Sequence, residues 1–354
     1  MYSETATSII DIDAFGAAYI SVGDYVGNSD RLQLWYWIMC ILMYIFKYPI
    51  VVKIINIFIG VWCIAYIYKL SLRVYPQKKK IAILAAKLYA FFPYPVFFCC
   101  FLYKDQFLTL ITLALFYTAS APRTQFSPVR FLKIVALLLI FSFIRSGLVP
   151  ILLLSIGLIM INKSKIKLST KPIRVLIISL ITIMLAYYVY ISFANTILYK
   201  LEAYTGSRAS DSIYEGTTIR YFLINNIYDI WKLPFAYAFT IIQPLYIGGK
   251  IINWESIVAI LNVCNIPIVI VNVLYIFMKK SNKIFWISIM LLYAVMLFVS
   301  MGISRHFYYL LPYTFIFYAD AIYSRNEIIY TVNKASMAIS AFIAILMIPF
   351  LGVS

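Results

Sequence analysis

The chain has few charged side chains and few residues able to bind a metal. Only 12% of its 354 residues are charged, and only 13 are aspartate or glutamate. A soluble domain needs more polar surface than this, so water is not the solvent for most of the chain. A single histidine, His306, and five cysteines without metal-ligand spacing argue against a zinc site and a disulfide framework. Phosphate-cradling glycine loops and nucleophile elbows are also missing, which disfavours nucleotide-driven transport and serine hydrolysis.

Apolar sequence of membrane-spanning length is abundant instead, since 64% of the residues are hydrophobic. It predicts an all-α transmembrane bundle of about ten crossings, two of them short, that forms a single membrane domain over residues 1–354. Residues 34–47 are too short for a comfortable crossing, and we expect a helix lying near the outer interface there. The predicted spans are 48–69, 81–101, 105–121, 131–144, 148–161, 173–194, 254–278, 284–303, 307–324 and 328–352.

The 30 lysines and arginines give the chain a formal net charge of +17. In a soluble protein this excess would suggest nucleic acid as a partner, but here the basic residues are concentrated in alternate loops between predicted spans. Cytoplasmic loops of membrane proteins are rich in lysine and arginine, so we expect these loops in the cytoplasm and no nucleic-acid partner. The basic connections are 73–80, 122–133, 162–174, 279–283 and Arg325.

Charges that interrupt apolar sequence are predicted to gather on the opposite, extracytoplasmic face. An adjacent pair of opposite charges within the tract 91–117 is expensive in hydrocarbon, so it must line a polar interior or lie at a membrane edge. The segments assigned to this face are the acidic stretch 1–33, the turns at Lys104–Asp105, Arg145 and Arg305–His306, and a large loop of irregular or short helical structure over 195–253.

Two N-terminal carboxylates, Asp11 and Asp13, are the candidate catalytic residues. A carboxylate beside apolar sequence can act as general base for a sugar hydroxyl, or can help to hold a divalent metal ion. A solvated acidic tail explains these residues equally well, because their spacing is common. No other cofactor is expected.

Arginine and histidine on the same face are candidate anion-binding residues. Arg145 could make a bidentate contact with a phosphate or diphosphate, and the alternative is an arginine that snorkels from a helix end. Arg305 and His306 could bind an anionic leaving group and transfer a proton, or could anchor the chain at the interface.

Lys104 and Asp105 could orient this cluster, or could form a structural pair at the start of a helix near residue 105. In the large loop, Arg208 and Arg220 could bind a glycan or phosphate, and an ordinary solvated loop is the alternative. The prolines Pro93 and Pro95 place the Lys104–Asp105 pair in a turn between two helices.

The order of these elements resembles the GT-C superfamily, the polytopic glycosyltransferases that use polyprenyl-phosphate-linked sugars. The family begins with an extracytoplasmic acidic segment of the type D-x-x-x-Y, and DIDAFGAAY at 11–19 looks like it. AAKLYAFFPYPVFFCCFLYKD at 85–105 resembles the family's Ala-rich helix and Pro-bearing turn, with Asp105 at the acidic position. ISRHFYYLLPYTFIFYADAIY at 303–323 resembles the late Arg-to-Pro turn.

The general pattern is also similar to Wzy-type O-antigen polymerases of the bacterial inner membrane. That resemblance implies an enzyme that joins polyprenyl-diphosphate-linked repeat units at the extracytoplasmic face, with membrane lipid and a chain-length regulator protein as partners. One alternative is a GT-C transferase that moves a single sugar from a polyprenyl phosphate to a lipid or glycan. The other is a non-catalytic transporter of the lipid-linked glycan.

Overall fold

The secondary structure of the described residues is helical, without a strand, which confirms the all-α class. The predictions for residues 1–33 and 195–253 lie outside the described residues, except that Trp231 and Lys232 are described. The computed structural model describes residues 34–46, 48–92, 95–96, 99, 104–121, 128–145, 148–163, 231–232, 263, 265–278, 282, 285–290, 292, 308–324 and 326–347.

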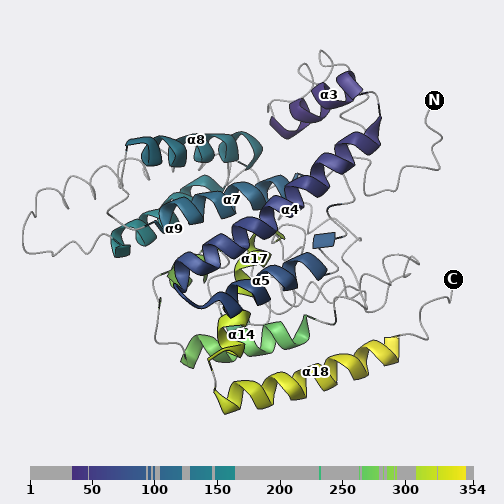
Figure 1. The fold of residues 1–354 in the computed structure, drawn as a ribbon, viewed down its shortest axis with the longest axis vertical. Helices are drawn as coiled ribbons and strands as arrows, with labels where there is room; N and C mark the ends of the chain where they lie inside the picture. The colour runs from purple at the N-terminus through teal and green to yellow at the C-terminus, as the bar shows by residue number, and fades with distance from the viewer. Residues whose placement is uncertain are drawn as a thin grey trace, which may run out of the picture.

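The helices follow one another in the order drawn in Figure 1. Their bounds are α3 Leu34–Phe46, α4 Pro49–Val74, α5 Lys79–Phe91, α7 Asp105–Ala119, α8 Pro128–Arg145, α9 Val149–Lys163, α14 Ile266–Met278, the 3₁₀ helix η7 Tyr308–Leu310, α17 Leu311–Ile322 and α18 Glu327–Met347.

Most helices begin close to the predicted boundaries, and two differ from them. The sequence predicts a helix over 81–101, but the observed helix α5 ends at Phe91 and is therefore shorter than predicted. Phe92 has an extended backbone, with ψ of 133°, as the residue before Pro93 prefers. The short span predicted over 131–144 is an 18-residue helix, α8, because Pro128 is accommodated in its first turn.

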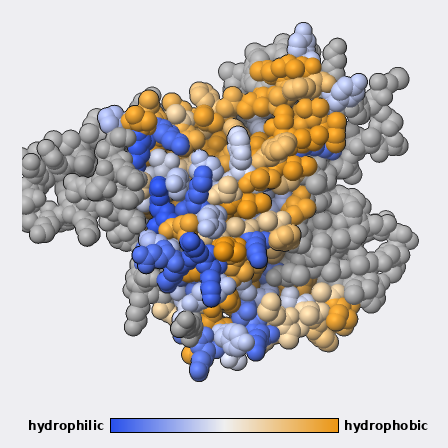
Figure 2. Space-filling model, viewed as in Figure 1, coloured by the Kyte–Doolittle hydropathy of each residue, from blue (hydrophilic) through white to orange (hydrophobic). Residues whose placement is uncertain are grey.

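Among the described residues, two helical stretches, Ile50–Val74 in α4 and Glu327–Leu346 in α18, are long and apolar enough to cross a membrane. Asp105–Ala119, Ile151–Met160 and Ile266–Met278 are shorter apolar helices. Large apolar side chains are exposed along α4 and α18, among them Phe58, Trp62 and Phe342. Figure 2 shows this apolar surface over α3 and the N-terminal half of α4.

Helix α7 is the central element of the described bundle. Twelve of its 15 residues are buried, on all sides of the helix. It packs against α4, α8, α9 and η7. A helix buried all round needs apolar or small polar residues at nearly every position, and the sequence DQFLTLITLALFYTA provides them.

The bundle has two ends, one at the N-terminus of α7 and one at its C-terminus, and each is identified by the residues that contact α7 there. At the α7 N-terminal end, Gln106 contacts α4 through Cys63, and Arg145 at the end of α8 lies over Tyr309 of η7. At the α7 C-terminal end, Tyr117 binds Arg73 near the end of α4. The charged turn at Lys104–Asp105 and the basic turn at 73–80 therefore lie at opposite ends, as the alternation of the loops predicted.

Two arginines donate hydrogen bonds to backbone carbonyls at the C-terminal end of α7. Arg73 Nη1 donates to the carbonyl oxygen of Tyr117 at 2.8 Å, and its guanidinium lies 3.7 Å from the centre of the Tyr117 ring. Arg130 in the first turn of α8 donates to the carbonyls of Thr118, Ala119 and Ala121. The last carbonyls of a helix lack intrahelical partners, so both arginines supply donors where the helix has negative partial charge.

Candidate functional site

Three of the predicted site residues lie at one end of the bundle. Lys104, Asp105 and Arg145 are all at the α7 N-terminal end, on two different helices. The other six predicted residues, Asp11, Asp13, Arg208, Arg220, Arg305 and His306, lie outside the described residues.

Lys104 and Asp105 start α7. Lys104 is the residue before the first helical turn, and Asp105 is the first helical residue, with its side chain buried. The hydroxyl of Thr109, one turn later, donates to the Asp105 carbonyl at 2.8 Å. A carboxylate suits this position because the unpaired N–H groups give a helix N-terminus positive partial charge.

Arg145 ends α8 beside the same turn. Its guanidinium lies 5.6 Å from the centre of the Tyr309 ring, within the range of a cation–π interaction. The Tyr309 hydroxyl is close enough to Arg145 and to Asp105 for both charges to act on it. Arg145, Asp105 and Tyr309, which come from three helices, therefore form one charged cluster.

Gln106 is the centre of a buried hydrogen-bonded group directly below this cluster. Tyr308 donates to Gln106 Oε1, and the Tyr89 hydroxyl lies 3.3 Å from the same oxygen and 3.0 Å from the Tyr308 hydroxyl. All three side chains are buried. The group ties α5 and η7 to the first turn of α7, and so fixes the backbone that carries Asp105 and Tyr309.

Helix α4 approaches this group closely at Gly60. A Cβ atom built on Gly60 would lie 2.5 Å from Cys99 Sγ and 2.8 Å from Gln106 Nε2, so only glycine fits without a shift. Three residues later, Cys63 Sγ lies 3.7 Å from the Gln106 carbonyl oxygen. Gly60 therefore permits the close packing of α4 against α7 at the level of the cluster.

Buried polar atoms around the cluster lack hydrogen-bond partners. Within the described part of the chain, Gln106 Nε2 and the hydroxyl of Tyr309 are buried and have no such partner. Burying such groups costs free energy, and function is a common reason for keeping them. Among the described residues, no group of three histidine, cysteine or carboxylate side chains could hold a metal.

A second polar group, which the sequence predictions missed, lies near the α7 C-terminal end. Asp320 on α17 is buried and accepts a hydrogen bond of 2.9 Å from the hydroxyl of Tyr275 on α14. Tyr75, just after α4, also bonds to Asp320 and accepts a bond of 2.9 Å from Trp286 Nε1. Burial, and then the charge of Asp320, raise the pKa of the Tyr75 hydroxyl well above its usual range.

We expect Gln106→Leu to lower the free energy of unfolding by about 2 kcal/mol, because it leaves buried tyrosine hydroxyls without their shared acceptor. Leucine keeps most of the volume, so the loss reports the hydrogen bonds. In a Tyr89→Phe/Tyr308→Phe background the same substitution should cost almost nothing. Unfolding of the full-length protein in detergent measures both values, and an equal cost in the two backgrounds would contradict the shared-acceptor assignment.

The fold and the site together define a helical protein with membrane-capable helices and a charged, hydroxyl-rich cluster at one end of the bundle. No family model matches the chain, and no curated protein or solved structure is significantly similar to it.

Proposed function

We propose that the protein is a polytopic enzyme of the bacterial inner membrane that joins polyprenyl-diphosphate-linked repeat units into a surface polysaccharide. One observation carries the proposal: Arg145, Asp105 and Tyr309 converge at the bundle end opposite the basic turns. If the basic turns face the cytoplasm, the cluster faces the periplasm, where lipid-linked glycans are polymerised.

The cluster has groups suited to a diphosphate leaving group. The guanidinium of Arg145 has a planar pair of donors that can hold two phosphate oxygens at once. Arg145 would stabilise the negative charge that develops as the glycosidic bond to the diphosphate breaks. Arg305 and His306, which closely precede η7 in the sequence, are assigned to the same leaving group.

Asp105 and Lys104 are assigned a supporting role. Asp105 is buried in the first turn of α7, where it can orient neighbouring donors and cations. The general base that deprotonates the attacking sugar hydroxyl is assigned to Asp11 or Asp13. In this scheme the hydroxyl oxygen bonds to the anomeric carbon, the base takes the proton, and the diphosphate leaves with the bonding electrons.

Deletion of the gene should leave a single repeat unit on the lipopolysaccharide core, seen as loss of the ladder on a gel. Purified full-length protein in liposomes should elongate lipid-linked repeat units. An altered or undecorated repeat unit in the deletion strain would instead identify a single-sugar transferase. Movement of the lipid-linked units across the bilayer without elongation would identify a transporter, and either result would overturn the polymerase assignment.

A further inference from the structure

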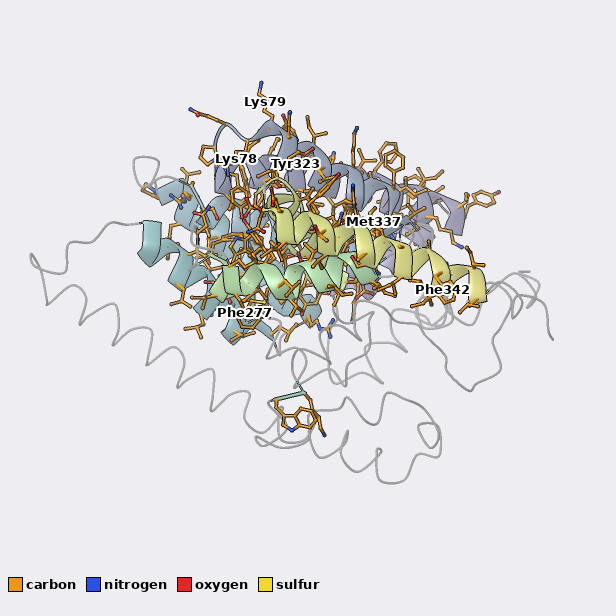
Figure 3. All side chains as sticks on the ribbon, turned by 90° about the horizontal axis from the view of Figure 1, so that it is seen from below. Lys78, Lys79, Phe277, Tyr323, Met337 and Phe342 are labelled. Atoms are coloured by element: carbon orange, nitrogen blue, oxygen red, sulfur yellow. The ribbon has the colours of Figure 1, made fainter. Side chains whose placement is uncertain are left out.

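Basic side chains are concentrated at the α7 C-terminal end of the bundle. Figure 2 shows hydrophilic residues over the end of α4 and the first turns of α5 and α8, beside the apolar surface. Figure 3 shows Lys79 pointing away from the bundle. We call Lys78, Lys79, Lys80 and Lys133, all of them exposed, together with the half-buried Arg73 and Arg130, the basic patch.

Among the described residues, few acidic side chains could compensate the positive charge of the basic patch. The acidic residues that the structure describes are Asp105, Asp320 and Glu327. Asp105 lies at the other end of the bundle, Asp320 is buried in its tyrosine group, and Glu327 is exposed at the start of α18. Within the described part of the chain, Lys79, Lys80 and Lys133 form no ion pair.

The two arginines raise the local charge further. Arg73 and Arg130 bind the last carbonyls of the same helix and lie close enough for their like charges to act on each other. Their hydrogen bonds to α7 fix both guanidinium groups in place, so the patch has a rigid cationic centre. Around it, Lys79, Lys80 and Lys133 are exposed and can reach an anion without breaking an ion pair within the described bundle, whereas Lys78 lies 5.8 Å from the centre of the Tyr75 ring.

Apolar side chains are interleaved with the basic ones at the start of α8. Val129, Phe131 and Leu132 are 73%, 57% and 68% exposed, on either side of Arg130 and next to Lys133. A soluble anion or a nucleic acid would leave these side chains in water. An anionic phospholipid would cover them with its acyl chains while its headgroup meets the cations.

We propose that the basic patch binds anionic phospholipid headgroups of the adjacent membrane leaflet in preference to zwitterionic ones. The inference depends on the membrane location of the chain and not on the proposed polymerase activity. Each lysine near an anionic membrane surface adds a favourable electrostatic contribution that salt weakens. The contact would stabilise the end of the bundle where the two arginines hold α7.

The test compares the lipids retained by the full-length protein after purification from vesicles of phosphatidylethanolamine with phosphatidylglycerol. We expect phosphatidylglycerol to be enriched around the wild type. Lys79→Gln/Lys80→Gln/Lys133→Gln should lower its apparent affinity by roughly a hundredfold, at about fivefold for each lysine. Native mass spectrometry counts the bound lipids of each type.

The charge control is Lys53→Gln/Lys87→Gln/Lys334→Gln, which removes the same net charge at positions outside the patch, from the exposed Lys87 and Lys334 and the half-buried Lys53. It should keep the enrichment. Equal losses in the two triple variants, or no enrichment in the wild type, would overturn the proposal. Displacement of phosphatidylglycerol by inorganic phosphate at low concentration would identify a site for soluble phosphate and would also overturn it.

Discussion

Arg145→Ala should reduce elongation of lipid-linked repeat units by roughly a hundred- to a thousandfold, the usual effect of removing one group that stabilises transition-state charge. The guanidinium lies over the Tyr309 ring, half-buried at the end of α8, and no described residue forms an ion pair with it. Its charge is therefore available to a substrate anion. Polymer made by the full-length variant in liposomes measures the effect.

Arg145→Lys tests whether the positive charge alone is enough or whether the planar guanidinium is also required. Lysine keeps the positive charge but lacks the planar pair of donors that fits a phosphate, so activity should fall between those of the wild type and Arg145→Ala. Lys87→Ala, which removes an exposed cation of α5, should leave elongation unchanged. Wild-type activity in Arg145→Ala would remove this arginine from the proposed site.

Tyr309 provides a test of how Arg145 is held. Its hydroxyl has no hydrogen-bond partner among the residues that the structure describes, whereas its ring faces the guanidinium. Tyr309→Phe keeps the ring and should therefore retain most of the elongation activity. Tyr309→Leu removes the ring that contacts the Arg145 guanidinium and should lower the activity. An inactive Tyr309→Phe variant would assign the hydroxyl itself a role in the reaction.

Local sequence signals predicted the helix starts well. Asp105 is the first residue of α7, as expected from a carboxylate at a helix N-terminus, and Arg145 at the end of α8 lies over Tyr309 at the same end of the bundle. The alternation of basic turns predicted which of these residues share an end. These features depend on near neighbours in the sequence, so a single sequence contains them.

Long-range polar contacts could not be predicted in the same way. Gln106 and Tyr308 are 202 residues apart, and neither differs by type from many other polar or aromatic residues of the chain. Their pairing depends on how α5, α7 and η7 pack, which hydropathy does not encode. The length of α8 was also underestimated, because Arg130 looked like a loop residue although it binds the end of α7.

Unlike Gln106 and Tyr308, Asp320 stands in a sequence context that indicates a buried polar contact. FYADAIY, within the predicted span 307–324, contains a lone carboxylate, and a charge there is expensive in hydrocarbon for the same reason as Lys104 and Asp105. This cost predicts a partner for such a residue, and Tyr275 and Tyr75 are the partners in the structure. The sequence alone does not identify these two tyrosines as the partners, because they lie 45 and 245 residues away from Asp320 in the chain.

Asp320→Ala should therefore destabilise the protein by about 3 kcal/mol, because it removes charged hydrogen bonds and leaves two buried tyrosine hydroxyls without this acceptor. Glu327→Ala is the matched control. It also removes one carboxylate, but from an exposed position in the first turn of α18, and should cost about 0.5 kcal/mol. Unfolding of the full-length proteins in the same detergent gives both values.

A double-mutant cycle shows whether the loss comes from the hydrogen bonds or from the vacated space. Tyr275→Phe alone removes one donor to Asp320 and should cost about 1–2 kcal/mol. In the Asp320→Ala background the same change removes a hydroxyl that has already lost this acceptor, so its cost should fall close to zero. Additive costs would mean that the two side chains stabilise the fold independently. A coupling of the expected size would instead assign Asp320 the role of joining α14, α17 and the end of α4.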